Sequence, residues 1–177
     1  MRTLRPSFAF FLAPALALAF ACGSSAQSAR LTTRVDAGLV KAIRHYRVAA
    51  IRLQHVMGGP IPKVAPLRHA SLEHVRVVWQ RRAAVVRRRF AAGPAHRSAW
   101  LCIHRYEGSW RDNRGPYYGG LQMDVGFQQH YGRALLRAKG TADHWTPLEQ
   151  MWIAEKAYRA GRGFYPWPNT ARYCGLL

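Results

Sequence analysis

The stretch YYGGLQMD, residues 117–124, sets the local fold of this 177-residue chain, and its first tyrosine stands ten positions after Glu107. Adjacent aromatic residues favour an extended strand, while paired glycines permit the positive φ angles of a tight turn. We therefore predict a strand that enters a turn at the two glycines.

Glu107 closes a short apolar segment, WLCIHRYE. Trp100, Ile103 and Glu107 recur at spacings of three and four, which places them on one face of a helix, with the acid on the packed side. Ser98 is the expected N-cap, and Gly108 is the expected stop. The negative end of the helix dipole and apolar neighbours both disfavour an ionised carboxylate. Glu107 is therefore a candidate general acid, which must hold a proton before it donates it.

Aromatic and polar side chains near the turn are suited to bind a sugar. Tyrosines can stack on sugar rings, glycines allow close approach of the backbone, and amide or carboxylate groups bind hydroxyl and acetamido groups. Asp124 could instead cap the helix that follows. The candidate substrate-binding residues are Trp110, Tyr117, Tyr118, Gly119, Gly120, Gln122, Asp124 and Trp167.

A second helix is predicted after Thr146, which forms a capping box with Glu149. Trp152 on this helix is expected in the core, and Glu155 is expected to be a structural charge. Trp167, which precedes a proline, is expected to face the groove instead.

In this order the residues resemble the resuscitation-promoting factors, secreted proteins with a small lysozyme-like, transglycosylase-type domain. The similar pattern has a Trp seven residues before the Glu, a Gly and a Trp after it, and then YYGGLQ at 117–122. Further on, EQMWIAEKA at 149–157 and WPNTARYC at 167–174 are similar to the closing helix and the Trp-Pro tail. The resemblance implies a mainly helical α+β domain over 97–177, with a short β-turn region.

The resemblance also implies cleavage of the β-1,4 bond between N-acetylmuramic acid and N-acetylglucosamine in peptidoglycan. A lone Glu107 could act first as acid and then as base, toward water or toward the muramyl 6-hydroxyl. A retaining hydrolase would instead need a second carboxylate about 5 Å away, and an inverting enzyme one farther off. Asp112 and Asp124 are the nearest in sequence, so muramidase and lytic transglycosylase both stay open. His104 and Glu107 alone match no recognisable metal-ligand spacing, and we expect neither a metal nor a cofactor.

The family's tail ends in a cysteine, here Cys174, but its other cysteine directly precedes the Glu, where this chain has Tyr106. Cys102 lies one helical turn before Tyr106 on nearly the same face, so a bridge to Cys174 remains reachable. The third cysteine, Cys22, falls in a predicted export signal, which leaves this pair for a disulfide; two buried free thiols are the alternative.

Residues 1–26 have the pattern of a secretory signal peptide: Arg2 and Arg5, an apolar run, and then small residues. We therefore expect a secreted protein associated with the cell wall. The apolar run is shorter than the ~20 residues that span a bilayer and contains Pro14, so no stable transmembrane anchor is expected. Lipidation of Cys22 stays open.

Residues 31–92 are predicted to form a basic helical hairpin of two antiparallel helices, joined by the glycines and prolines of GGPIPKVAPL. The apolar stripe of the first helix is Val35, Leu39, Ile43, Tyr46, Ala50, Leu53 and Met57. The stripe of the second is Leu72, Val75, Trp79, Ala83, Val86 and Phe90.

More than half of the net charge of +19 falls between residues 31 and 96. Such a surface attracts anionic wall polymers, although the arginines could simply be a solvated face. Nucleic acid is not an expected partner, because the chain carries an export signal and no reading motif. The expected partner is peptidoglycan.

Two other functions remain open. The protein could bind the wall without catalysis, or it could act on membranes as a cationic protein. Glu107, taken alone, could be a surface residue paired with Arg105 or Arg111.

Overall fold

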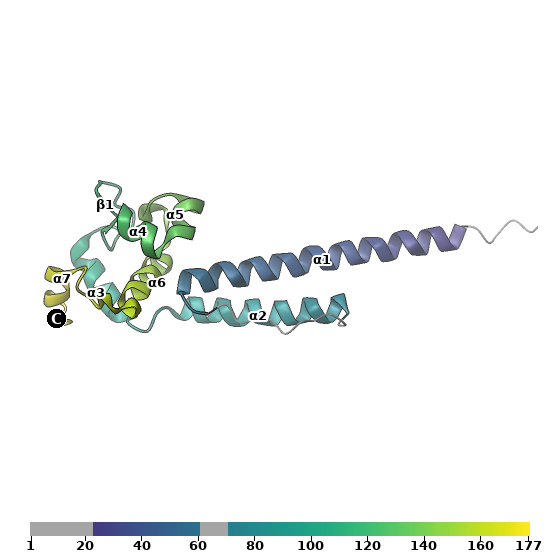
Figure 1. Cartoon of the computed structure of the whole chain (residues 1–177), viewed down its shortest axis with the longest axis horizontal. Coiled ribbons are helices and arrows are strands. Elements are labelled where there is room, and N and C mark those ends of the chain that lie inside the picture. The colour runs from purple at the N-terminus through teal and green to yellow at the C-terminus, as the bar shows by residue number, and fades with distance from the viewer. Residues whose placement is uncertain (1–22, 61–70) are drawn as a thin grey trace, which may run out of the picture. The chain divides into compact units, whose positions relative to one another are not determined.

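A computed structural model describes residues 23–60 and 71–177, with side chains from residue 36 onward (Figure 1). The described part is mainly helical with one small sheet, which confirms the predicted mainly helical α+β class. The helices are α1 Gly23–Met57, α2 Leu72–Ala92, α3 Arg97–Glu107, α4 Val125–Tyr131, α5 Arg133–Lys139, α6 Pro147–Ala157 and α7 Pro168–Tyr173. The strands are β1 Tyr117–Tyr118 and β2 Met123–Asp124, and short 3₁₀ and π turns occupy Ala142–His144 and Tyr158–Arg162.

By its contacts the chain divides into Met1–Gly38 and Leu39–Leu177. The second unit therefore contains α2 and the end of α1 together with the predicted catalytic domain, and no boundary falls at residues 92–97. The apolar run of the predicted signal peptide, Cys22 and most of the predicted connection at 58–67 lie outside the described residues.

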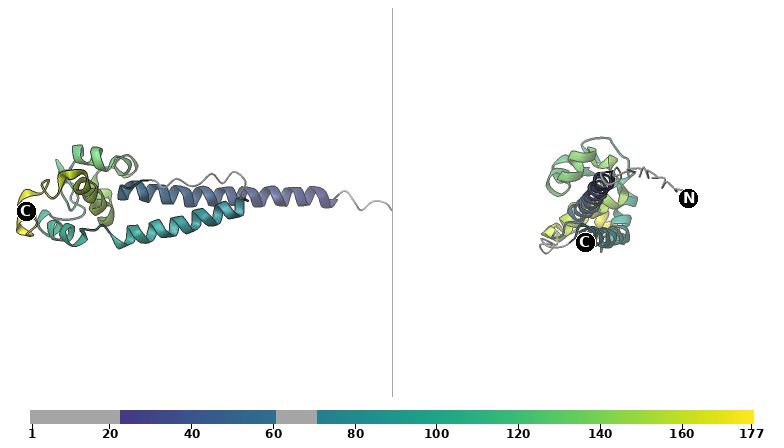
Figure 2. Two further views of the ribbon diagram at one scale, coloured as in Figure 1. Left: turned by 60° about the horizontal axis from the view of Figure 1, so that its bottom comes forward. Right: turned by 90° about the vertical axis from the view of Figure 1, so that its right-hand side faces the viewer.

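The two basic helices do not form the predicted antiparallel hairpin. Within the second unit, α2 lies beside the C-terminal part of α1 and runs in the same direction (Figure 1, Figure 2). The guanidinium of Arg47 lies 5.8 Å from the ring centroid of Trp79, and further along both helices contact the same part of the chain. There Arg159 donates to the carbonyl of Met57, and Trp152 Nε1 donates to the carbonyl of Phe90 at 3.1 Å.

The parallel arrangement has a simple physical basis. The 21 residues of α2 span about 30 Å. The sequence between Met57 and Leu72, at about 3.3 Å per extended residue, is long enough to cover that distance. A connection of this length therefore permits α2 to run either parallel or antiparallel to α1. The predicted stripes are largely inward: Ala50, Met57, Trp79, Ala83 and Val86 are buried, whereas Leu72 is exposed.

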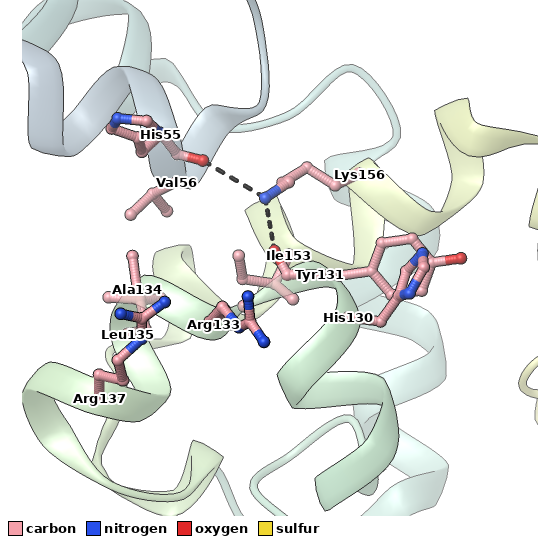
Figure 3. A pocket seen from close by; sticks show the side chains of 11 residues that line it. His55, Val56, His130, Tyr131, Arg133, Ala134, Leu135, Arg137, Ile153 and Lys156 are labelled. Carbon is pink, nitrogen blue, oxygen red and sulfur yellow. Dashed lines mark hydrogen bonds between the residues drawn. The ribbon is translucent and has the colours of Figure 1, made fainter.

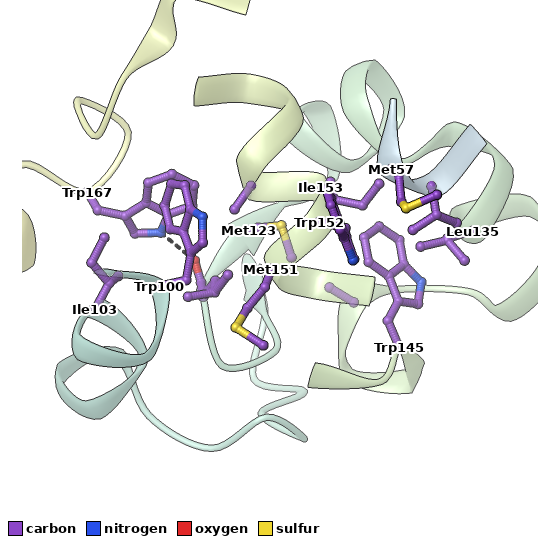
Figure 4. Close-up of a cluster of buried hydrophobic side chains, with 14 of the residues drawn as sticks. Met57, Trp100, Ile103, Met123, Leu135, Trp145, Met151, Trp152, Ile153 and Trp167 are labelled. Atoms are coloured by element: carbon purple, nitrogen blue, oxygen red, sulfur yellow. Dashed lines mark hydrogen bonds between the residues drawn. The ribbon is translucent and has the colours of Figure 1, made fainter. Parts of the chain in front are cut away.

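The core of the second unit surrounds α6 (Figure 4). Eight of the eleven residues of this helix are buried, including Trp152 as predicted, so the core packs against most of its surface. Met57 from α1 also enters this core and is only 1% exposed. The capping box of Thr146 and Glu149 begins α6, as predicted.

The start of α3 differs from the prediction. The helix begins at Arg97, and His96 rather than Ser98 occupies the N-cap position, without a side-chain cap. The His96 backbone N–H and ring Nδ1 instead contact the Glu155 carboxylate, which also accepts a hydrogen bond from Trp100 Nε1 at 2.9 Å. Glu155 is 2% exposed, so it is the structural charge that the sequence predicts.

A disulfide joins Cys102 on α3 to Cys174 just after α7, with an S–S distance of 2.07 Å. The predicted pairing is therefore present. Over residues 23–60 and 71–177, no helix is both long and apolar enough to cross a bilayer.

Candidate active site

Glu107 is the last residue of α3, as predicted, and Gly108 follows with a φ of 124°. The carboxylate is half-buried, and its Oε1 accepts a hydrogen bond of 2.8 Å from Thr170 Oγ1 on α7. Within the described part of the chain Glu107 forms no ion pair, so the pairing with Arg105 or Arg111 is not found.

Sequence reasoning did not identify Thr170. It lies 63 residues after Glu107, and the contact requires α7 to pack against α3. The disulfide between these two elements keeps α7 near the end of α3. Cys174 was the sequence feature that could have pointed to Thr170, because a bridge from α3 places the residues just before Cys174 close to Glu107.

The predicted strand and turn are present. β1 and β2 pair in antiparallel register, with Tyr117 opposite Asp124 and Tyr118 opposite Met123. Tyr117 is exposed and Tyr118 is half-buried, so both retain surface for a ligand.

Gly119 and Gly120 are buried, and the space above them is filled by the protein rather than open to a ligand. A methyl group added to Gly119, whose φ is +73°, would lie 2.5 Å from Gln150 Oε1. One added to Gly120 would lie 2.5 Å from His104 Nδ1 and 2.8 Å from the Trp110 ring. The predicted substrate contact of the two glycines is therefore corrected: they let the turn pack against its own domain.

Trp110 is half-buried and stacks on His104, with ring centroids 3.8 Å apart. His104 Nδ1 in turn lies 3.1 Å from the carbonyl oxygen of Gly120. The stack thus links the end of α3 to the turn.

Gln150 on α6 holds the turn from beneath, and the sequence analysis did not single it out. Its side chain is fully buried, and Oε1 accepts from the Gly120 N–H at 2.9 Å. Its Nε2 donates to the carbonyls of Trp110 at 2.9 Å and Ala142 at 2.8 Å. A glutamine inside an apolar helix was the available signal, because a buried amide needs partners.

Gln122 and Asp112 lie near Gly108, next to Glu107. A methyl group on Gly108 would lie 3.7 Å from Asp112 Oδ2 and 4.0 Å from Gln122 Nε2. Gln122 has a φ of 46°, uncommon for a residue with a side chain, and its amide donates to Asp112 at 3.1 Å and to the Gly119 carbonyl at 3.1 Å. Both amide hydrogens are thus used within the protein.

Asp112 is held as a carboxylate. Arg114 donates to it through Nε at 3.0 Å and Nη2 at 2.9 Å. This guanidinium, with help from the Arg114 backbone and the Gln122 amide, holds the pKa of Asp112 well below its usual range. Asp112 therefore remains ionised beside the candidate site.

Asp124 caps α4, as the alternative reading predicts, because its Oδ1 accepts from the Phe127 N–H at 2.7 Å. It also borders a cavity of about 340 Å³, together with Phe127, Tyr131 and Arg162. Asp124 is thus still available to a ligand on one side.

Trp167 does not face a groove. Its ring is 4% exposed and packs against Trp100 and Phe127, with centroids 5.1 and 5.6 Å away. Its Nε1 donates to the Leu121 carbonyl at 2.6 Å. The predicted role in substrate binding is wrong, because the ring fills the core between α3, α4 and the turn.

The end of α3, the turn and α7 together place a half-buried carboxylate beside the Thr170 hydroxyl and one residue from Gly108, which lies near Asp112 and Gln122. Among known proteins, no family model, no curated protein and no solved structure matches this chain.

Proposed function

We propose that the protein is a secreted glycosidase that cleaves the β-1,4 bond between N-acetylmuramic acid and N-acetylglucosamine in peptidoglycan. The proposal rests on the surroundings of the Glu107 carboxylate. A half-buried carboxylate at a helix end, bound by a hydroxyl and by no cation of the described residues, suits a group that gains and loses a proton.

In the proposed first step Glu107 protonates the glycosidic oxygen while an oxocarbenium-like centre develops on the sugar. The Thr170 hydroxyl donates to Oε1, so Oε2 is the oxygen left to carry the transferred proton. The bond to the leaving sugar breaks, and Glu107 becomes a carboxylate. In the second step this carboxylate takes a proton from water or from the muramyl 6-hydroxyl, and the attacking oxygen bonds to the anomeric carbon.

Asp112 and Asp124 are the acidic residues nearest to Glu107 in sequence, and their hydrogen bonds favour the mechanism with a lone Glu. Asp112 accepts hydrogen bonds from Arg114 and Gln122, and Asp124 caps α4. A nucleophile needs a free oxygen directed at the sugar. Both oxygens of Asp112 already accept hydrogen bonds, and Glu107 does not line the cavity that Asp124 borders. We therefore propose a lytic transglycosylase, whose product is a 1,6-anhydromuramyl end.

The test is mass spectrometry of soluble products after the protein acts on isolated peptidoglycan. Glu107→Gln should release no fragments, whereas Glu73→Gln, a matched change on the exposed surface of α2, should act like the wild type. Anhydro ends support the transglycosylase, and reducing ends would replace it by a muramidase. Equal release by the wild type and Glu107→Gln would overturn the role of Glu107.

A second candidate is a wall-binding protein without catalysis, favoured by the outer face of α2. Arg81, Arg87, Arg88 and Arg89 are exposed, and no ion pair joins them to a carboxylate of the described residues. In that case neither the wild type nor Glu107→Gln would release fragments, yet both would sediment with the walls.

A further inference from the structure

A cavity of about 480 Å³ lies where the end of α1 meets α4, α5 and α6, and it includes neither Glu107 nor any other residue of α3 or α7 (Figure 3). His55 and Val56 of α1 form one side, and Arg133 and Arg137 of α5 face them from the other. Lys156 and Ile153 contribute from α6. The cavity therefore combines cationic and apolar walls.

No carboxylate of residues 23–60 and 71–177 neutralises the positive charge in this cavity. The described residues that line it include no carboxylate. Arg133, Arg137 and Lys156 form no ion pair with any described carboxylate. Among the described residues, Lys156 donates to the carbonyls of His55 and Tyr131, and burial together with the charge of Arg159 lowers its pKa. Such an uncompensated concave surface attracts an anion.

The cavity continues into an apolar one. A neighbouring cavity of about 280 Å³ shares His55, Val56 and Leu135 with the first and extends along α1 to Val48 and Ile51. Val48 is 56% exposed, so the apolar wall is open to a ligand. A bound molecule could thus place a charged head in the first cavity and a hydrocarbon chain in the second.

We propose that the joined cavities bind a phosphate-headed amphiphile, with the phosphate at Arg133 and Arg137 and the apolar chain along Val48 and Ile51. Two guanidinium groups near an ammonium suit the double charge and the several acceptor oxygens of a phosphate. The site goes beyond peptidoglycan cleavage, because Glu107 and Thr170 line neither cavity and a glycan strand has no hydrocarbon chain.

The test is calorimetric titration of the full chain with dodecyl phosphate below its micelle concentration. Dodecyl maltoside supplies the chain without the charge, and inorganic phosphate supplies the charge without the chain. Dodecyl phosphate should bind at one site and more tightly than either. Arg133→Gln/Arg137→Gln should weaken binding by about tenfold or more. Arg88→Gln/Arg89→Gln, which removes the same charge from α2, should not.

A second variant tests the apolar half. Ile51→Ser should weaken dodecyl phosphate binding and leave the weak binding of inorganic phosphate unchanged. Equal loss in both arginine pairs would overturn the site in favour of a general charge effect. Equal affinity for dodecyl and inorganic phosphate, or no binding, would also overturn it. Circular dichroism confirms that each variant is folded.

Two further arms identify the source and separate this proposal from the cleavage reaction. The ligand is a bilayer lipid if the protein sediments with phosphatidylglycerol vesicles, does not sediment with phosphatidylcholine vesicles, and loses this binding in Arg133→Gln/Arg137→Gln. Binding of soluble dodecyl phosphate without binding to either kind of vesicle indicates a free amphiphile. Both results support the site. Glu107→Gln should bind the amphiphile normally, and Arg133→Gln/Arg137→Gln should cleave peptidoglycan normally.

Discussion

The Thr170 hydroxyl fixes one oxygen of the Glu107 carboxylate and so determines how the other is presented. Replacing Thr170 with Val keeps the shape of the side chain but removes the donor. We expect kcat on peptidoglycan to fall about tenfold, because a misdirected acid loses its alignment with the glycosidic oxygen. The unfolding free energy should fall by about 1 kcal/mol. Thr170→Ser, which keeps the hydroxyl, should restore kcat; if it resembles Thr170→Val, the hydroxyl has no such role.

Glu149 gives the stability a defined dependence on pH. Burial opposes its ionisation, but hydrogen bonds from Lys139 and Thr146 outweigh burial and lower the pKa of Glu149 below its ordinary 4.5. A pKa that is lower in the folded state stabilises the protein above 4.5, and this contribution is lost as pH falls through the folded value. Glu149→Gln should therefore flatten the pH dependence below 4.5, measured by urea unfolding from pH 7 to pH 3. An unchanged slope would contradict this role.

At this scale the sequence predicts what depends on near neighbours. The place of Glu107 at a helix end, the capping box of Thr146 and the cap at Asp124 follow from spacing within one or two turns. The partner of Glu107 and the burial of Trp167 depend on how α7 packs, which no local pattern encodes. A Trp before a proline can lie in a groove or a core, and only the fold decides.

Among the elements, the turn between β1 and β2 has little room for added volume. A methyl group on Gly120 would overlap His104 and Trp110, so Gly120→Ala should lower the unfolding free energy by about 2 kcal/mol. Gly38→Ala is the matched control, because Gly38 lies in α1 with nothing within 4 Å; it should gain up to about 1 kcal/mol. Denaturant unfolding measures both. An unchanged stability in Gly120→Ala would mean that His104 and Trp110 move aside easily.

The sequence predicts most elements but not their relative directions. The apolar stripes of α1 and α2 correctly indicate helices and their inner faces. A stripe has no direction, however, and the sequence between Met57 and Leu72 is long enough for either arrangement. The arrangement is parallel because Arg47 contacts Trp79, and because Met57 and Phe90, near the ends of the two helices, both bind the region of α6 and the turn after it.

For the whole molecule, the disulfide closes a loop that covers about half of the second unit. Cys102 and Cys174 are 72 residues apart in sequence, and a loop of that length constrains the unfolded chain by about 4 kcal/mol. Cys102→Ala/Cys174→Ala should lose about this much in a urea titration, and reduction of the wild type should match it. The reduced wild type should also lose peptidoglycan cleavage before it unfolds globally, because α7 carries Thr170. Full activity in the reduced protein would show that α7 stays in place without the bridge.

Because Met57 is buried in the core, residues 97–177 cannot be transferred to another protein on their own. Arg159 donates to the carbonyl of Met57 and Lys156 to that of His55, both in α1, and Met57 fills space between α5 and α6. The segment from residue 97 onward is therefore not an independent structural unit. Recombination, natural or engineered, that moved the Glu107 site into another protein would have to carry the basic helices with it as a single block.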